Sequence, residues 1–137
     1  MSGGLDFTIG PTRHAYFNVR VAESMRVTSG GTLVDSQGRT GGERVSGTGA
    51  RWVDYSGPVG GAHRAGIAVL PGPRSSEVTW FVYDWGTVTV NPFFPEGRLI
   101  RLGEAVTLDA RLVVHDGDAA AIDLEALHQE YLGEAGA

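Results

Sequence analysis

The stretch that decides the fold lies at residues 80–93 and reads WFVYDWGTVTVNPF. Valine, threonine and aromatic residues are enriched in β-strands, and successive side chains in a strand point to opposite faces. We therefore expect residues 78–90 to form one long strand. One row holds Trp80, Val82, Asp84, Gly86, Val88 and Val90, and the other holds Phe81, Tyr83, Trp85, Thr87 and Thr89. Because both rows carry large side chains, the row that contains Phe81, Tyr83 and Trp85 suits either a ligand groove or a second buried layer.

Outward from this stretch the chain repeats the pattern in shorter pieces. Its 21 glycines are spread along the sequence and separate runs rich in valine and threonine, which is typical of strands joined by turns. The other expected strands are residues 15–21, 25–28, 31–35, 43–55 with a break at 47–49, 65–70, 99–101 and 105–115. The prediction is an all-β chain, either an antiparallel β-sandwich or a curved, barrel-like sheet.

Two segments near the C-terminus have clear periodicity. In residues 106–114 every second residue is apolar, and we expect the row that contains Leu112 and Val114 to face the core. Residues 118–132 carry apolar side chains at helical spacing, which predicts a single C-terminal helix. Asp118 or Asp123 is placed to cap its start, and Gly133 to end it.

Length and composition exclude several classes of protein. With 137 residues we expect one domain over residues 1–137, with residues 1–12 and 133–137 frayed. The absence of cysteine excludes disulfides and thiolate catalysis, and it favours the cytoplasm. A net charge of −5 argues against binding nucleic acid, since that affinity comes from a basic surface. No secretory signal and no apolar run of bilayer length is visible.

Several segments taken in order resemble the PmoA-like family, whose members carry the label methane oxygenase PmoA. They are FNVRVAESMRV, GGTLVDSQGRTGGERVSGTGARWVDYSGPVGG, GIAVL, WFVYDWGTVTVNPF and ARLVVHDGD. The resemblance implies a sandwich-like domain allied to carbohydrate-binding sandwiches. Phe81 and Tyr83 stand where that family has histidine and arginine, and Pro71 to Pro73 replace its Asp-His-Pro, so its site chemistry is not carried over. The match is to the C-terminal part of longer members, which predicts a homodimer that covers an otherwise open sheet.

Four residues are candidates for acid/base catalysis. Asp84 lies on a largely apolar row, where burial would raise the pKa of its carboxyl into the range that acid catalysis needs, unless an arginine pairs with it. Tyr83 is its neighbour. Asp54 precedes an expected Ser-Gly-Pro turn, where it suits either a general base or an acceptor for turn amides. His63 lies in the glycine-rich segment PVGGAHRAG, as a proton-transfer group or as a solvated loop histidine.

A ligand would be held by aromatic and polar side chains around these four. The expected ligand-binding residues are Trp80, Phe81, Trp85, Tyr55, Arg51 and Asn91. No two histidines have the spacing of a metal motif, so we expect no metal site and no cofactor. His115 with the acids of HDGD suits a cation, but a strand-to-helix connection explains the same letters.

Three functions remain open from the sequence. The first is a small enzyme without a cofactor, of the isomerase, cyclase or lyase type, acting on a small organic molecule such as one of specialised metabolism. The second is a non-catalytic module that binds a sugar or another small ligand. The third is a structural partner subunit of a larger enzyme.

Overall fold

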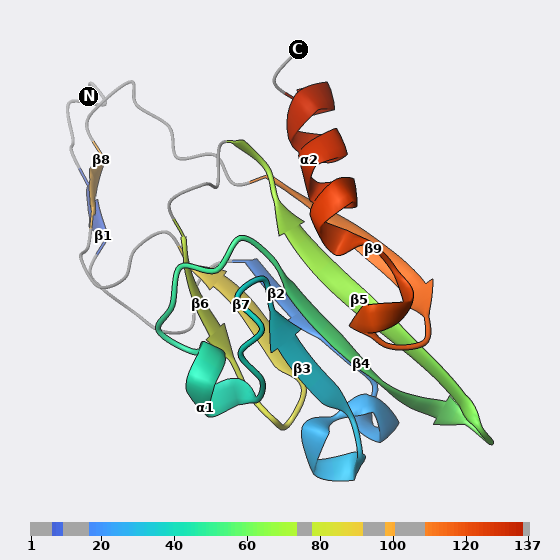
Figure 1. The fold of residues 1–137 in the computed structure, drawn as a ribbon. Helices are drawn as coiled ribbons and strands as arrows, with labels where there is room; N and C mark the ends of the chain where they lie inside the picture. Colours follow the sequence, from blue (N-terminus) through green and yellow to red (C-terminus); the bar gives the residue numbers. More distant parts are fainter. Residues whose placement is uncertain (1–6, 10–16, 74–77, 92–97, 101–108, 136–137) are drawn as a thin grey trace, which may run out of the picture.

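The computed structural model describes residues 7–9, 17–73, 78–91, 98–100 and 109–135. This part of the chain is mostly β, with antiparallel sheets and a helix at the C-terminus (Figure 1), which confirms the predicted fold class. Of the two architectures expected, the described strands form the sandwich-like one. No helix in these residues is long and apolar enough to cross a membrane.

The larger sheet has four strands in the order β3 (Thr32–Asp35), β4 (Val53–Gly60), β5 (His63–Pro71) and β9 (Ala110–Asp116). β4 and β5 form a long hairpin, and the chain reverses at Gly60 and Gly61, which both have positive φ angles. Glycine adopts such angles without steric cost, which explains the GG in this turn.

The smaller sheet has three strands in the order β2 (Phe17–Arg20), β7 (Thr87–Asn91) and β6 (Thr79–Val82). A separate pair is formed by β1 (Phe7–Ile9) and β8 (Arg98–Ile100). Facing side chains of the two larger sheets fill the main core, which includes Leu33, Val53, Tyr55, Val69, Trp80, Val82, Val88 and Val90. Trp80 is fully buried there, and its indole N–H donates to the Ala50 carbonyl over 2.6 Å.

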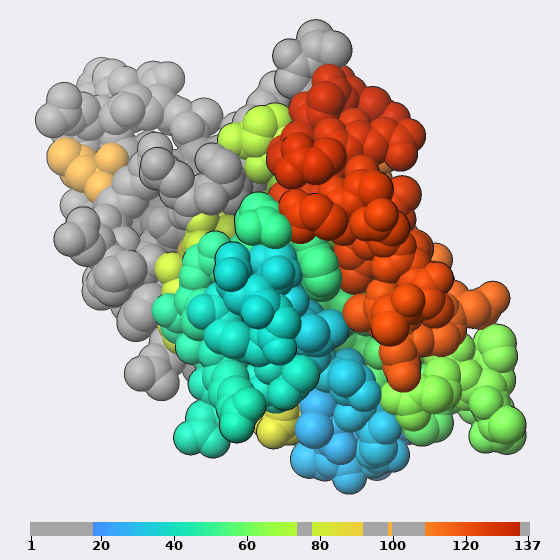
Figure 2. Space-filling view, in the orientation of Figure 1, coloured from blue at the N-terminus to red at the C-terminus, as the bar shows by residue number. Residues whose placement is uncertain are grey.

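Short helical segments connect and cover the sheets. Three of them lie at the edge of the main core: η1 (Glu23–Met25), η2 (Val27–Ser29) and α1 (Gly42–Val45). Two more, η4 (Ala119–Ala121) and α2 (Leu124–Ala135), follow β9. α2 packs against the face of the four-stranded sheet that points away from the main core, where Leu124 meets Ala68 and Leu70. In Figure 2 the C-terminal segment and the α1 region occupy neighbouring parts of one face.

Residues 78–90, expected to form one long strand, form two. β6 ends at Val82 and β7 begins at Thr87, and the two pair as a hairpin with Trp80 opposite Val90. Gly86 makes the reversal possible, with a φ of 112°. The turn was not predicted, because the residues around it have high β-propensity and Gly86 is the only glycine in it.

Two other expected strands are helical or irregular. Residues 25–28 lie in η1 and η2, and the first part of residues 43–55 forms α1. The expected turn Ser56 to Pro58 is instead strand β4, because it continues to pair with β5. There, Gly57 allows the Met25 backbone to pass so closely that a Cβ would lie 2.6 Å from it.

The C-terminal predictions were partly correct. Asp123 caps α2 by accepting from the Ala126 N–H over 3.0 Å, as expected, but the helix runs through Gly133. The row of β9 that contains Leu112 and Val114 lies on the face of the main core, as expected, but it is not buried there: Val114 is 77% exposed, while Val113 on the other face packs beneath the C-terminal segment. Ala110 at the start of β9 packs against the main core, whereas Leu112 and Val114 lie beyond the core formed by the described residues. Residues 105–108 of this expected strand lie outside the described residues.

Candidate functional site

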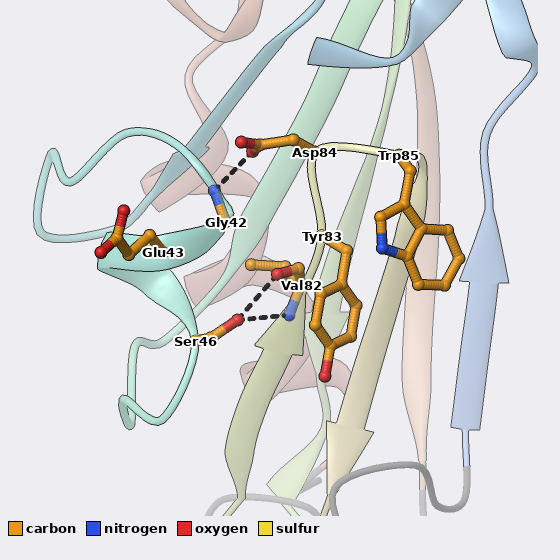
Figure 3. A pocket seen from close by; sticks show the side chains of 7 residues that line it. All are labelled: Gly42, Glu43, Ser46, Val82, Tyr83, Asp84 and Trp85. Carbon is orange, nitrogen blue, oxygen red and sulfur yellow. Dashed lines mark hydrogen bonds between the residues drawn. The ribbon is translucent and has the colours of Figure 1, made fainter. Parts of the chain in front are cut away.

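An open groove lies between α1 and the turn that joins β6 to β7. Its volume is about 430 Å³, within the range of about 300–1,000 Å³ usual for small-ligand sites. The lining residues are Gly42, Glu43, Ser46, Val82, Tyr83, Asp84 and Trp85 (Figure 3). Three of the residues predicted from the sequence, Tyr83, Asp84 and Trp85, are therefore brought together at one place.

Asp84 holds α1 against the β6–β7 turn. Its Oδ1 accepts from the Gly42 backbone N–H over 2.7 Å, which satisfies one of the free donors at the start of α1. The two segments approach so closely that a Cβ on Gly42 would lie 2.7 Å from the Val82 carbonyl oxygen. Asp84 is only partly exposed and lines the groove, so its carboxylate serves the fold and faces a ligand-sized space at once.

Ser46 adds a second link between α1 and β6. Its hydroxyl donates to the Val82 carbonyl over 2.7 Å and accepts from the Val82 N–H over 2.9 Å (Figure 3). The side chain thus completes the hydrogen bonding of β6 in place of a neighbouring strand. The floor of the groove is fixed as a result.

Tyr55 fixes the turn from the core side. Its ring is fully buried, and its hydroxyl lies 2.9 Å from the Asp84 carbonyl oxygen and 3.1 Å from the Tyr83 carbonyl oxygen. The same hydroxyl accepts from the Val27 N–H over 3.0 Å. Burial raises the pKa of this phenol, so it remains a donor at neutral pH. Tyr55, predicted to contact a ligand, instead positions the backbone that carries Tyr83 and Asp84.

Two aromatic rings form one wall of the groove. Tyr83 and Trp85 are stacked, with ring centroids 5.1 Å apart and planes inclined by 15°. The Arg20 guanidinium carbon lies 5.4 Å from the centre of the Trp85 ring. Trp85 is 44% exposed, which is unusual for the largest side chain. In Figure 3 the Tyr83 ring lies between Trp85 and the α1 residues that line the opposite wall.

Other predicted ligand-binding residues lie elsewhere. Trp80, Phe81 and Asn91 are buried, with at most 4% of their surface exposed, and none of them lines the groove. Arg51 is exposed and binds Glu125 of α2 through two hydrogen bonds of 3.0 and 2.6 Å. That contact holds the pKa of the Glu125 carboxyl down to about 2.

Asp54 has a different environment from the one predicted. It lies within β4, fully buried on the face covered by the C-terminal segment, and its Oδ1 is 2.5 Å from Nε2 of His115. Its Oδ2 is also buried and has no hydrogen-bond partner in the described part of the chain. Close packing enforces the contact, because a Cβ on Gly66 would lie 2.7 Å from the His115 ring.

The partners of His115 determine where its protons are. Nδ1 lies 3.1 Å from the Asp116 carbonyl oxygen, which can only accept, so Nδ1 carries a hydrogen. Nε2 and the Asp54 carboxyl must then share one further proton. Burial raises the pKa of Asp54, and the hydrogen bond to His115 opposes that rise. Burial disfavours charged His115, yet its hydrogen bonds to Asp54 and Asp116 raise the pKa of the imidazole overall.

The four catalytic candidates therefore do not form one cluster. Tyr83 and Asp84 line the groove, and Asp54 is sealed beneath the C-terminal segment. His63 begins β5, with 61% of its side chain exposed and its Nε2 3.2 Å from the Asp116 carboxylate. In the described residues no group of three or more His, Cys, Asp and Glu side chains is placed to hold a metal ion.

Sequence reasoning missed one whole wall of the groove. Glu43 and Ser46 were assigned to a strand and Gly42 lay just outside it, so nothing suggested that these residues meet the β6–β7 turn. The available signal was the pair of glycines before Glu43, because Gly41 has a φ of 83° and breaks strand geometry.

A family model described as a family of unknown function, DUF6807, matches residues 2–129. The chain belongs to this family. The resemblance to the PmoA-like family is therefore corrected, because the model that matches is that of DUF6807. No curated protein and no solved structure matches the chain. Membership of DUF6807 carries no activity with it.

Proposed function

We infer that this DUF6807 domain is a binding module for a small polyhydroxylated ring, such as a pyranose sugar, held in the groove between α1 and the β6–β7 turn. The observation that carries this inference is the stacked pair of half-buried Tyr83 and exposed Trp85 in a groove that Glu43 and Asp84 also line. Aromatic faces pack against the apolar faces of such rings, and carboxylates accept hydrogen bonds from ring hydroxyls.

Rigidity of the groove supports the same proposal. Asp84 is bound to the Gly42 amide, Ser46 is bound to the Val82 backbone, and Tyr55 fixes the turn from below. A ligand would therefore meet walls that are already in place. Binding costs less free energy when the site does not have to be ordered first.

Calorimetric titration with a panel of monosaccharides and short oligosaccharides tests the proposal. We expect at least one saccharide to bind, and Tyr83→Ala to abolish that binding. Val59→Ala is the control, because Val59 is an exposed apolar residue on the β4–β5 hairpin, outside the groove. If no saccharide of the panel binds, or if Tyr83→Ala binds as tightly as the wild type, the proposed function is wrong.

The acid/base enzyme is the second candidate, and one observation favours it. The Asp84 carboxylate and the Tyr83 side chain line the same groove, so a bound ring would meet an acid and a phenol together. Isomerisation is the simplest reaction for such a pair, and interconversion of sugar anomers can be followed by proton NMR. Asp84→Asn removes the acid but keeps the contact with α1, because the amide oxygen of asparagine can still accept from the Gly42 N–H. Faster interconversion with the wild type, lost in Asp84→Asn, would establish the enzyme, whereas equal rates would leave binding alone.

Self-association is also part of the proposal. Leu112 is 44% exposed and Val114 77% exposed on the face of the four-stranded sheet that carries the main core. Apolar side chains on an inner sheet face are usually covered, and a second copy is the simplest cover. Analytical ultracentrifugation over a wide concentration range tests this: a dimer is expected, and a monomer throughout would contradict it.

A further inference from the structure

β9 is the outermost strand of the four-stranded sheet. Among the described residues it pairs with β5 on one side only, from Ala65 opposite Asp116 to Pro71 opposite Ala110. Figure 1 shows it at the border of the sheet farthest from β6 and β7. An edge strand offers a row of backbone N–H and C=O groups to any strand that can pair with it.

The inner face of this edge lacks the usual protection at its centre, because the one charged residue of the inner row, Asp116, lies at the end of the strand. Natural edge strands discourage pairing with charges that point inward, with proline or with bulges. β9 instead places Leu112 and Val114 there, and its seven residues pair with β5 in unbroken register. The charged side chain of Arg111 lies on the opposite face, where it contacts Glu134 and Tyr131 of α2.

Strand geometry limits how a second copy can pair. Directly opposed residues in antiparallel strands share a face, so Leu112 and Val114 must meet residues of the same row. The register centred on Val113 overlaps all seven residues of β9. It sets Leu112 of each copy opposite Val114 of the other.

We propose that β9 pairs antiparallel with β9 of a second copy about a two-fold axis at Val113, which joins the two four-stranded sheets into one. The inference rests on the self-association proposed above and names its surface. The apolar row Val69 and Leu112 would continue into Val114 and Ile67 of the second copy, because β5 already pairs Val69 with Leu112 and Ile67 with Val114. Both exposed side chains of β9 are then covered by equivalent contacts.

The interface formed by the two β9 strands, here called the β9 seam, is small, so the fraction of dimer should depend on protein concentration. One strand of seven residues is short of the roughly 1,200 Å² that stable complexes bury. A two-fold arrangement nevertheless closes on itself and does not grow into fibres. We expect monomer and dimer in exchange, with dimer favoured as concentration rises.

Single cysteines test the register, because the chain contains no cysteine of its own. An equal mixture of Leu112→Cys and Val114→Cys chains should form a disulfide-linked mixed dimer on oxidation. Each variant alone should not, since its two cysteines would then be diagonal neighbours about 7–8 Å apart, beyond the reach of about 7 Å for a disulfide. Val59→Cys, exposed but on the β4–β5 hairpin, is the control that should give no disulfide-linked dimer.

Val114→Arg provides an independent measurement. The side chain is 77% exposed, so the variant should unfold at the wild-type temperature yet sediment as a monomer, while Val59→Arg keeps the dimer. A wild-type dimer that survives Val114→Arg, or that gives no mixed disulfide, would overturn the β9 seam and leave self-association standing. A wild-type monomer at every concentration would overturn both.

Discussion

The buried pair of Asp54 and His115 makes a strong prediction about stability. His115→Ala leaves the Asp54 carboxyl fully buried and removes the imidazole partner of its Oδ1. Breaking a buried ion pair by removing one member costs about 3–5 kcal/mol, a large part of the roughly 5–15 kcal/mol that stabilises a domain. Asp54→Asn should cost less, about 1–3 kcal/mol, because the amide can still donate to Nε2 of a neutral imidazole.

The same pair predicts a dependence on pH. An unfolded histidine loses its proton near pH 6.5, whereas the folded pair keeps its proton to higher pH, because the pKa of His115 and that of Asp54 are both raised. The folded state then binds more protons than the unfolded state above that value. The free energy of unfolding should therefore fall as pH rises past neutrality, and this fall should be smaller in Asp54→Asn.

Urea unfolding followed by tryptophan fluorescence at pH 6 and pH 9 measures both effects. The wild type should lose stability between the two pH values, and Asp54→Asn should lose less. If His115→Ala proved no more costly than Asp54→Asn, or if both proteins showed the same pH dependence, the shared proton would be the wrong description of this contact.

Three further predictions concern the supports of the groove and of α2. Gly42→Ala should destabilise the fold by about 1–3 kcal/mol in urea unfolding, as overpacking does. Gly49→Ala should be nearly neutral, because its Cβ would come no closer than 3.9 Å to a neighbour. Equal effects of the two substitutions would contradict the close approach of Gly42 to the Val82 backbone. Tyr55→Phe should cost about 1–3 kcal/mol, because it leaves buried backbone groups without their partner, and a neutral result would show that the turn is held by other means. In Arg51→Ala the pKa of the Glu125 carboxyl should rise from about 2 towards its ordinary 4.5 in a carbon-13 NMR titration, and an unchanged pKa would contradict the assigned ion pair.

Local patterns were enough to place several strands. Residues 31–35 and 65–70 are short runs that contain adjacent apolar residues and end at Asp35 and before Pro71, and β3 and β5 occupy these positions. The Asp123 cap was also predictable, because its hydrogen bond to Ala126 is made three residues along the chain. Such features depend only on neighbours in sequence.

Features that depend on distant contacts were not predictable. α1 was mistaken for a strand because its place is set by Asp84, 42 residues from Gly42. The pair of Asp54 and His115 spans 61 residues and arises from the register of β4, β5 and β9. Asp54 looked like the end of a strand because the letters Ser-Gly-Pro usually mark a turn, yet pairing with β5 keeps these residues extended.

The central claim is that the groove between α1 and the β6–β7 turn binds a small ring. Nitrogen–proton NMR spectra of the labelled protein, recorded while the saccharide panel is added, test it most directly. The account predicts that a binding saccharide shifts the amide signals of Gly42, Tyr83 and Asp84 and the indole signal of Trp85, and leaves those of Trp52 and Trp80 in place. Shifts confined to another surface, or no shifts with any saccharide, would contradict it.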